Sequence, residues 1–295
     1  MFTRPVRARH RAAPAPRRRI ARFGAVLAAL VVLLSGWGIS TAATASAAPT
    51  AAPGAIGHDV STPQCGHTLP ETGAFGIVGV NGGRAFTPNP CFASEYDWAK
   101  RRPAAPGVYI NTGNPAPRSD YYWPASGSRD PALCRDSTST RDPGCAYNYG
   151  WHAAAAALAA ADRVDPTSRS RTWWLDVETV NSWNGDGIAN AADLQGVVDL
   201  LRSKGVARVG LYSTAYQWRT ITGGYTASSA GTYRTAWRSA FTPRYRLDSV
   251  PLWIATTGDA AAAKTACATS FTGAPAQMVQ FVDGSGIDAN YVCRR

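Results

Sequence analysis

The fold is decided by Thr172-Trp173-Trp174-Leu175-Asp176-Val177-Glu178, a run of β-branched, aromatic and aliphatic residues that ends in two carboxylates. Side chains alternate between the two faces of a strand, so Trp174, Asp176 and Glu178 share one face. The residues between them share the other face and are all apolar. We therefore expect a buried strand over 172–178 that opens into a polar site at its carboxyl end.

Further apolar runs of strand length lie on both sides of this stretch and alternate with helical stretches. Strands are expected over 56–60, 75–81, 107–111, 172–178, 208–213, 251–255 and 277–281. Helices are expected over 90–100, 145–163, 191–204, 215–221 and 260–269. Apolar strands separated by helices favour a parallel sheet that is covered on both faces. With a short or irregular eighth strand, the prediction is an α/β fold: a single irregular (β/α)8-like TIM barrel of predominantly parallel strands.

The first 47 residues are predicted to be a secretory signal peptide. An arginine-rich start is followed by the apolar run 25–34 and by Ala45-Ser46-Ala47, which has the form of a cleavage site. Residues 48–55 are interpreted as a linker and residues 56–295 as the barrel domain. We expect a secreted, extracellular protein, compatible with association with the cell wall, that does not bind membranes once the signal is removed. The arginine pair before Phe23 leaves open whether export is Sec or twin-arginine.

Removal of the signal changes the charge balance. It holds 8 of the 30 basic residues and none of the 19 acidic ones, so the mature chain carries a net charge of about +3. A balance this small gives no support for nucleic-acid binding. A monomer is expected.

Six cysteines lie in the mature part, where an exported chain can oxidise them. Fifteen pairings are possible in principle. We expect pairs between neighbours in the sequence: Cys65–Cys91, Cys134–Cys145 and Cys267–Cys293. Neither a C-x-x-C nor an H-x-x-x-H spacing occurs, so neither a metal nor another cofactor is expected.

Polar and aromatic residues follow the predicted strands at one end of the barrel. The carboxyl ends of parallel barrel strands meet at one mouth, where active sites are built. Each such residue alone is equally well explained as a turn former or a helix cap. Their shared placement favours a site, which we predict to contain Asp59, Asp176, Glu178 and Asp288 as acids, and Asn81, Asn111, Tyr212, Trp253 and Gln280 as binding residues.

The two acids of the central strand suit the cleavage of a glycosidic bond. They are on the order of 6–7 Å apart at Cβ, twice the rise of a strand. Because two ionised carboxylates at this separation repel, one of them tends to hold its proton at neutral pH. A neutral acid beside a charged one is the pair that glycoside hydrolysis uses.

Two loops are expected at the same mouth. Trp183 lies five residues after Glu178, and its flat face suits stacking on a sugar ring. The long segment 112–144 lacks periodicity and follows a predicted strand, so it belongs at the carboxyl end of the barrel.

The motifs in order resemble those of glycoside hydrolase family 25, the lysozymes that act as muramidases. The resemblance covers nearly the whole mature chain, and it is closest to an actinobacterial secreted glycoside-hydrolase-like branch. It rests on Gly57-His58-Asp59-Val60-Ser61, Leu175-Asp176-Val177-Glu178, Leu211-Tyr212-Ser213-Thr214, Leu252-Trp253-Ile254-Ala255, Val279-Gln280-Phe281 and Ile287-Asp288-Ala289-Asn290. A family 18 chitinase fits less well, because its motif needs a further acid at the position of Trp174.

The resemblance implies an irregular β/α barrel that hydrolyses a β-linked cell-wall glycan, peptidoglycan above all. It implies Glu178 as the general acid, Asp176 as its partner, and Asp59 and Asp288 as supporting carboxylates. A second hypothesis belongs to another class: a non-catalytic glycan-binding or cell-envelope protein that keeps the barrel without the reaction. The polysaccharide is the partner under both hypotheses.

Overall fold

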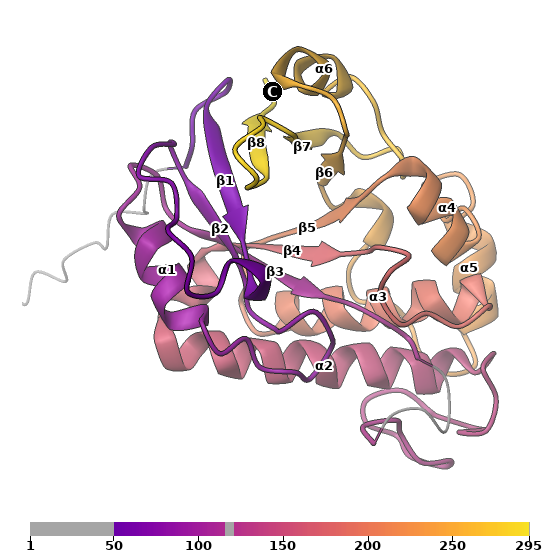
Figure 1. Ribbon diagram of the computed structural model, residues 1–295. Coiled ribbons are helices and arrows are strands. Elements are labelled where there is room, and N and C mark those ends of the chain that lie inside the picture. The colour runs from indigo at the N-terminus through magenta and orange to yellow at the C-terminus, as the bar shows by residue number, and fades with distance from the viewer. Residues whose placement is uncertain (1–49, 116–120, 295) are drawn as a thin grey trace, which may run out of the picture. The chain divides into compact units, whose positions relative to one another are not determined.

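Residues 50–115 and 121–294 are described by the computed structural model. Eight strands form one closed barrel in which each strand pairs with the next in the chain and the last pairs with the first (Figure 1). The predicted closed α/β barrel is thereby confirmed. The predicted signal peptide, residues 1–47, and the first two residues of the predicted linker lie outside the described residues.

The strands are short and close to their expected positions. They are β1 (Ile56–Val60), β2 (Gly76–Gly79), β3 (Gly107–Asn111), β4 (Thr172–Asp176), β5 (Arg208–Ser213), β6 (Leu252–Ala255), β7 (Ala276–Phe281) and β8 (Ala289–Val292). The expected strand over 172–178 ends two residues early, so Glu178 lies just beyond β4. A further backbone hydrogen bond of 2.9 Å, from the Val177 amide to the Tyr212 carbonyl, keeps this extension against β5.

The parallel arrangement holds from β1 to β7 and ends at β8. This last strand runs antiparallel to both β7 and β1. Only residues 282–288 connect β7 with β8, and a connection without a crossover helix can join only antiparallel strands. The expected short eighth strand therefore exists, but it reverses direction, and Asp288 precedes a strand rather than capping a helix.

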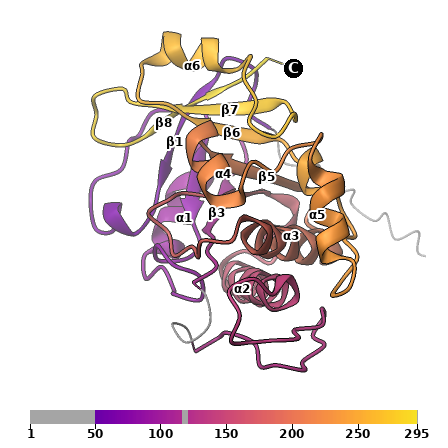
Figure 2. The same ribbon diagram turned by 90° about the vertical axis from the view of Figure 1, so that its right-hand side faces the viewer.

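Helices cover the outside of the barrel (Figures 1 and 2). They are α1 (Phe92–Lys100), α2 (Pro143–Val164), α3 (Gly187–Ser203), α4 (Ala215–Thr222), α5 (Ala230–Trp237) and α6 (Ala260–Ala266). Short 3-10 helices lie at Thr62–Gln64, Ser168–Ser170 and Leu247–Ser249. Helix α5 was not among the helices expected from the sequence. No helix in the described part of the chain has the length and apolar content to cross a bilayer.

The two longest helices, α2 and α3, lie side by side (Figure 2). Glycines permit the close approach: a Cβ at Gly150 would lie 2.1 Å from the Asp193 carbonyl oxygen, and a Cβ at Gly196 would lie 2.2 Å from the Tyr147 carbonyl oxygen. Any larger residue at these positions would force the helices apart. This contact fixes the helical layer behind β4, the strand that carries the acid pair.

The alternation predicted for the central strand is confirmed. Trp173, Leu175 and Val177 belong to the large apolar cluster between the sheet and the helices. Trp174 belongs instead to a second cluster inside the barrel, together with Tyr212 and Trp253. Asp176, two residues after Trp174, therefore faces the barrel interior.

All three expected disulfides are present, and no free cysteine remains among the described residues. Cys134–Cys145 ties the long segment after β3 to the first turn of α2. Cys267–Cys293 ties the end of α6 to the residue after β8. These two disulfides thus anchor the long segment after β3 and strand β8, which closes the barrel.

Candidate active site

The carboxyl ends of the parallel strands and the start of β8 bring the predicted acids into one mouth. Asp59 on β1 is buried, and its backbone amide donates a 3.2 Å hydrogen bond to the Asp288 carbonyl. Its carboxylate accepts hydrogen bonds from the side chains of Asn290, at 2.6 Å, and Gln280, at 3.1 and 3.2 Å. Residues separated by more than 200 positions in the chain thus hold one carboxylate.

The pKa of Asp59 lies near neutral pH. Burial raises its pKa from an ordinary value of 3.8 to about 7, although the Asn290 and Gln280 hydrogen bonds oppose the rise. The neighbouring charges of Asp288 and Glu178 raise the pKa further. The pKa of Asp288 is raised as well, because surrounding protein displaces water and because Asp283 is close by. The mouth therefore concentrates acidic groups that repel one another.

Asp176 is the most deeply buried of these acids, with 3% of its surface exposed. The Asn111 side-chain amide donates to its Oδ2, and no described residue donates to its Oδ1. Burial and the adjacent Glu178 raise its pKa well above 3.8. Glu178, half-buried just beyond the end of β4, supplies the neighbouring charge that adds to this rise. Asp176 therefore holds its proton at pH values at which an isolated carboxyl group would have lost it.

Asn81 and Asn111 support the pair from the neighbouring strands. The Asn81 amide donates to the Asn111 carbonyl at 3.0 Å, and its oxygen accepts from the Asn111 backbone amide at 2.8 Å. These two hydrogen bonds continue the β2–β3 pairing through a side chain. The Asn111 side chain is thereby left to donate its hydrogen bond to Asp176. Asn81 thus supports the backbone of β3, and Asn111 supports the acid.

Tyr212 and Gln280 connect the middle of the barrel to Asp59. The Tyr212 hydroxyl donates to Gln280 Oε1 at 2.6 Å, and Gln280 Nε2 donates hydrogen bonds to both carboxylate oxygens of Asp59. Burial raises the pKa of Tyr212, and so do the charges of Glu178 and Asp59, so it remains a neutral donor. The chain of bonds orients the amide of Gln280 with its nitrogen toward the carboxylate.

Trp253 and Trp183 lie apart from each other. Trp253 is fully buried in the barrel interior, where its ring meets Tyr212 at 4.5 Å and Trp174 at 5.7 Å between centroids. Trp183 is half-buried against the outer core, and its indole N–H donates to the Glu178 carbonyl at 2.8 Å. Trp253 thus forms the floor beneath the acids, whereas Trp183 anchors the backbone of Glu178.

Several residues around the acids were absent from the predicted set. Asn290 lies on β8, two residues after Asp288, which precedes the strand. In an extended segment this i, i+2 spacing predicts that both side chains lie on one side of the chain. Tyr109 lies two residues before Asn111 and has its pKa raised well above 10 by burial and by Asp59. Thr112 donates its hydroxyl to the Asp176 carbonyl at 2.6 Å. The i, i+2 periodicity of a strand could have indicated Asn290 and Tyr109 from the sequence.

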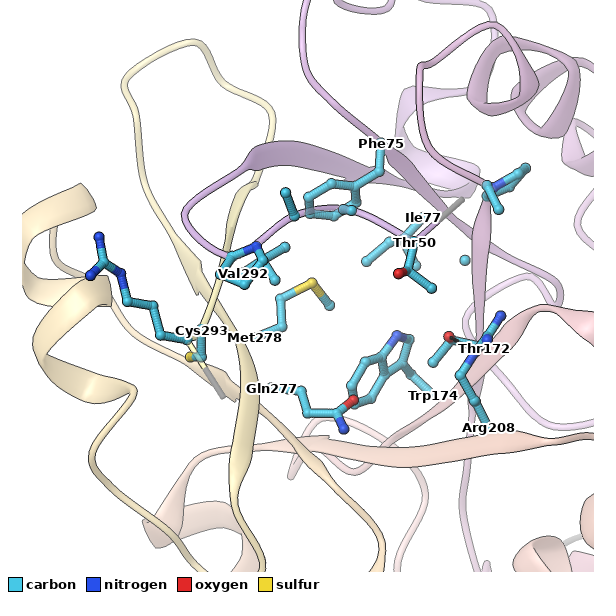
Figure 3. Close-up of a pocket in the computed structure, with 17 residues that line it drawn as sticks. Thr50, Phe75, Ile77, Thr172, Trp174, Arg208, Gln277, Met278, Val292 and Cys293 are labelled. Atoms are coloured by element: carbon cyan, nitrogen blue, oxygen red, sulfur yellow. Dashed lines mark hydrogen bonds between the residues drawn. The ribbon is translucent and has the colours of Figure 1, made fainter. Parts of the chain in front are cut away.

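The opposite end of the barrel has a cavity of a different kind. It measures about 700 Å³ and is lined by Phe75, Ile77, Met278 and Trp174, which turn toward one another (Figure 3). Its described lining contains no acidic residue. An apolar cavity at the amino ends of the strands cannot supply acid–base chemistry, so the site lies at the mouth. Within the described residues, no three His, Cys, Asp or Glu side chains are placed to hold a metal ion.

Comparison with known proteins finds similarity to lysozymes. Residues 159–242, which include β4 and the acid pair, match the family model described as Lysozyme-like protein 1. A probable GH family 25 lysozyme 4 from Dictyostelium discoideum is 46% identical over 56 residues. The chain is similar to family 25 lysozymes. The matched region is 19% of this chain and 25% of the Dictyostelium protein, so the chain spans about a quarter of the length of that relative.

Solved structures of similar arrangement include a muramidase from Trichobolus zukalii, with a TM-score of 0.47 and 16% identity over 81% of this chain and 94% of that one. A lysozyme from Streptomyces coelicolor gives a TM-score of 0.46 with 14% identity over 82% and 93% of the two chains.

Proposed function

We propose that this chain is a secreted glycoside hydrolase that cleaves a β-linked cell-wall glycan, peptidoglycan in the manner of a muramidase, with Glu178 as the general acid. One observation carries the proposal. Asp59, Asp176, Glu178 and Asp288 come from distant parts of the chain, and the charges of Glu178 and Asp288 raise the pKa of Asp59 while that of Glu178 also raises the pKa of Asp176. A folded protein gains no stability from gathering carboxylates that repel, so such clusters point to catalysis.

Glu178 suits the role of proton donor because it is the more exposed member of the pair. In the first step, its proton passes to the glycosidic oxygen while the bond from that oxygen to the anomeric carbon breaks. Water then attacks the anomeric carbon and returns a proton to the Glu178 carboxylate. The Trp183 indole donates a hydrogen bond to the Glu178 carbonyl and thereby fixes the position of this acid in the mouth.

Asp176 suits the role of partner rather than of attacking group. Its burial and its bond from Asn111 leave little freedom to approach a sugar. The substrate's own acetamido oxygen is then the better nucleophile: it bonds to the anomeric carbon as the glycosidic bond breaks, and the attacking water later displaces it from that carbon. Asp176 orients the acetamido group and stabilises the positive charge that develops on it. This route retains the configuration at the anomeric carbon.

Export of the mature protein, residues 48–295, and the closer likeness to an actinobacterial secreted branch belong to the same proposal. A disulfide-bonded barrel suits an oxidising compartment. The glycan substrate lies in that compartment.

The test is an analysis of the products from purified peptidoglycan. The wild-type protein is incubated with the glycan, the new reducing ends are reduced with borohydride, and the reduced sugars are identified by mass spectrometry. Reduced muramic acid is expected. Reduced glucosamine would show that a different linkage is cut. Binding of the protein to the pelleted glycan without new reducing ends would establish the non-catalytic alternative.

A further inference from the structure

A second hollow lies beside the acid pair, and three mouth loops build it. It measures about 570 Å³ and is lined by segments after β2, β3 and β4. Thr112 and Asn181 belong to its lining, and both donate hydrogen bonds to the Asp176 carbonyl, at 2.6 and 3.3 Å. The hollow therefore lies next to the end of β4, where Asp176 and Glu178 follow each other in the chain.

An aromatic shelf forms one side of this hollow. Phe86 stacks on Tyr122 with 4.0 Å between ring centroids and 8° between planes, and Tyr121 meets the edge of Tyr122 at 5.3 Å. Tyr121 is 94% exposed. Tyr149 closes the base of the shelf against the edge of Phe86. Exposed, rigid rings of this kind bind the apolar faces of sugars.

The backbone that carries Phe86 is strained to hold it there. Its φ of +61° is the one left-handed value for a residue other than glycine within 50–115 and 121–294. The loop is otherwise well ordered: Gly82 donates to the Thr87 carbonyl at 2.8 Å, and Asn81 pairs with Pro88 as an isolated bridge. Strain that a well-bonded loop retains for a bulky aromatic side chain indicates a functional position.

Arg84 is the one charged residue in the described lining of the hollow. It is exposed, and no acidic residue pairs with it in the described part of the chain. The acids are absent from the described lining, and Thr112 and Asn181 connect it to the backbone of Asp176. A ligand that spans both regions meets negative charge at one end and positive charge at the other.

We propose that Phe86, Tyr121, Tyr122 and Arg84 form an additional sugar-binding subsite that selects a sugar bearing a carboxylate. The ring of the sugar lies on the aromatic shelf, and its carboxylate faces Arg84. The inference rests on the proposed function, because it assigns the neighbouring part of the same glycan to this hollow. It also predicts that the protein needs a glycan longer than the two sugars that flank the cleaved bond.

The test separates binding from turnover. Peptide-free peptidoglycan oligosaccharides, in which the lactyl group of muramic acid supplies the carboxylate, are titrated into the Glu178→Gln protein by calorimetry at low salt. The same oligosaccharides are then converted to methylamides, which removes the charge. The native form is expected to bind about fivefold more tightly than the amide, as for one exposed ion pair. In Glu178→Gln combined with Arg84→Gln, the two forms are expected to bind equally.

Four further variants make the result specific, two at arginines and two at Tyr121. Arg84→Lys is expected to retain most of the preference, and Arg101→Gln, an exposed arginine just after α1, is expected to retain all of it. Tyr121→Ala is expected to weaken both forms about tenfold through lost stacking, whereas Tyr121→Phe leaves them unchanged. A preference that survives Arg84→Gln would overturn the proposal. Failure of the wild-type protein to release reducing ends would instead refute the proposed function and leave the binding result standing.

Discussion

The Asn290 side chain, on the one strand that reverses direction, donates a hydrogen bond of 2.6 Å to the carboxylate of Asp59 on the first strand. The bond spans the seam at which the barrel closes. Because β8 runs antiparallel to β1, the same register that places His58 opposite Ala289 places Asn290 within reach of Asp59. The β1–β8 pairing that closes the barrel therefore also positions the carboxylate of Asp59, a candidate active-site acid.

Replacement of Asn290 should move the titration of Asp59. Asn290→Ala removes a hydrogen bond that lowers the pKa, so the pKa of Asp59 is expected to rise above about 7. The lost buried bond should also lower the free energy of unfolding by about 1–3 kcal/mol. Carboxyl carbon shifts measured by NMR across pH report the first effect, and urea unfolding reports the second. Ser285→Ala, whose hydroxyl bonds only within the β7–β8 connection, serves as the control.

Asp59 should also make the protein less stable as pH rises. Its folded-state pKa of about 7 exceeds the unfolded value of about 3.9, so the folded protein binds its proton more tightly. Between about pH 4 and pH 7, the free energy of unfolding contributed by this group therefore falls by about 1.4 kcal/mol per pH unit. Asp59→Asn should flatten the pH dependence over this interval. If the free energy of unfolding of Asp59→Asn, measured with urea, fell with pH as steeply as that of the wild type, Asp59 would have an ordinary pKa.

Asp193 gives a second pH effect, away from the mouth. It lies on α3 with 1% of its surface exposed, and no described residue donates to either of its carboxyl oxygens. Burial raises its pKa well above 3.8. Asp193→Asn should match the wild type at pH 4 and exceed its free energy of unfolding at pH 8 by at least about 1 kcal/mol, because the amide cannot ionise. Equal stability at both pH values would argue for an ionised, solvated Asp193.

Trp183 is expected to act through the position of Glu178. Trp183→Phe keeps a ring against the core but removes the N–H that holds the Glu178 carbonyl. A lost neutral hydrogen bond of about 1 kcal/mol predicts a fall in kcat of about fivefold with little change in KM. A rise in KM at constant kcat would assign the indole to substrate binding instead, as the sequence first suggested.

Much of the barrel could be predicted because its signals are local. Each of β1 to β7 carries an apolar run of strand length, and each disulfide joins neighbouring cysteines. The strand β8 was expected only as short or irregular, since four residues after a glycine-rich connection carry no periodicity. The helix α5 has Gly231, Thr232 and Thr235, which are weak helix formers, and buried Tyr233 and Trp237 stabilise it through packing.

The acids of the site could be predicted for a different reason. Parallel strands deliver their carboxyl ends to one mouth, so Asp59 and Asp176 follow from topology alone. The aromatic shelf does not follow from topology. The stacking of Phe86 on Tyr122 depends on a left-handed residue in the loop after β2 and on the path of the loop after β3. Trp183 shows the same limit: its position after Glu178 indicated the mouth, but only the loop conformation turns its N–H onto a backbone carbonyl.

The most direct measurement compares wild-type protein with Glu178→Gln for the release of reducing ends from purified peptidoglycan. The substitution keeps the shape of the side chain and removes its proton-donating acid. The wild type is expected to release reducing ends steadily, and the variant is expected to fold with an unchanged circular dichroism spectrum while losing at least about 100-fold in rate, the contribution of a positioned general acid. A folded Glu178→Gln protein that turns over at the wild-type rate would contradict the account.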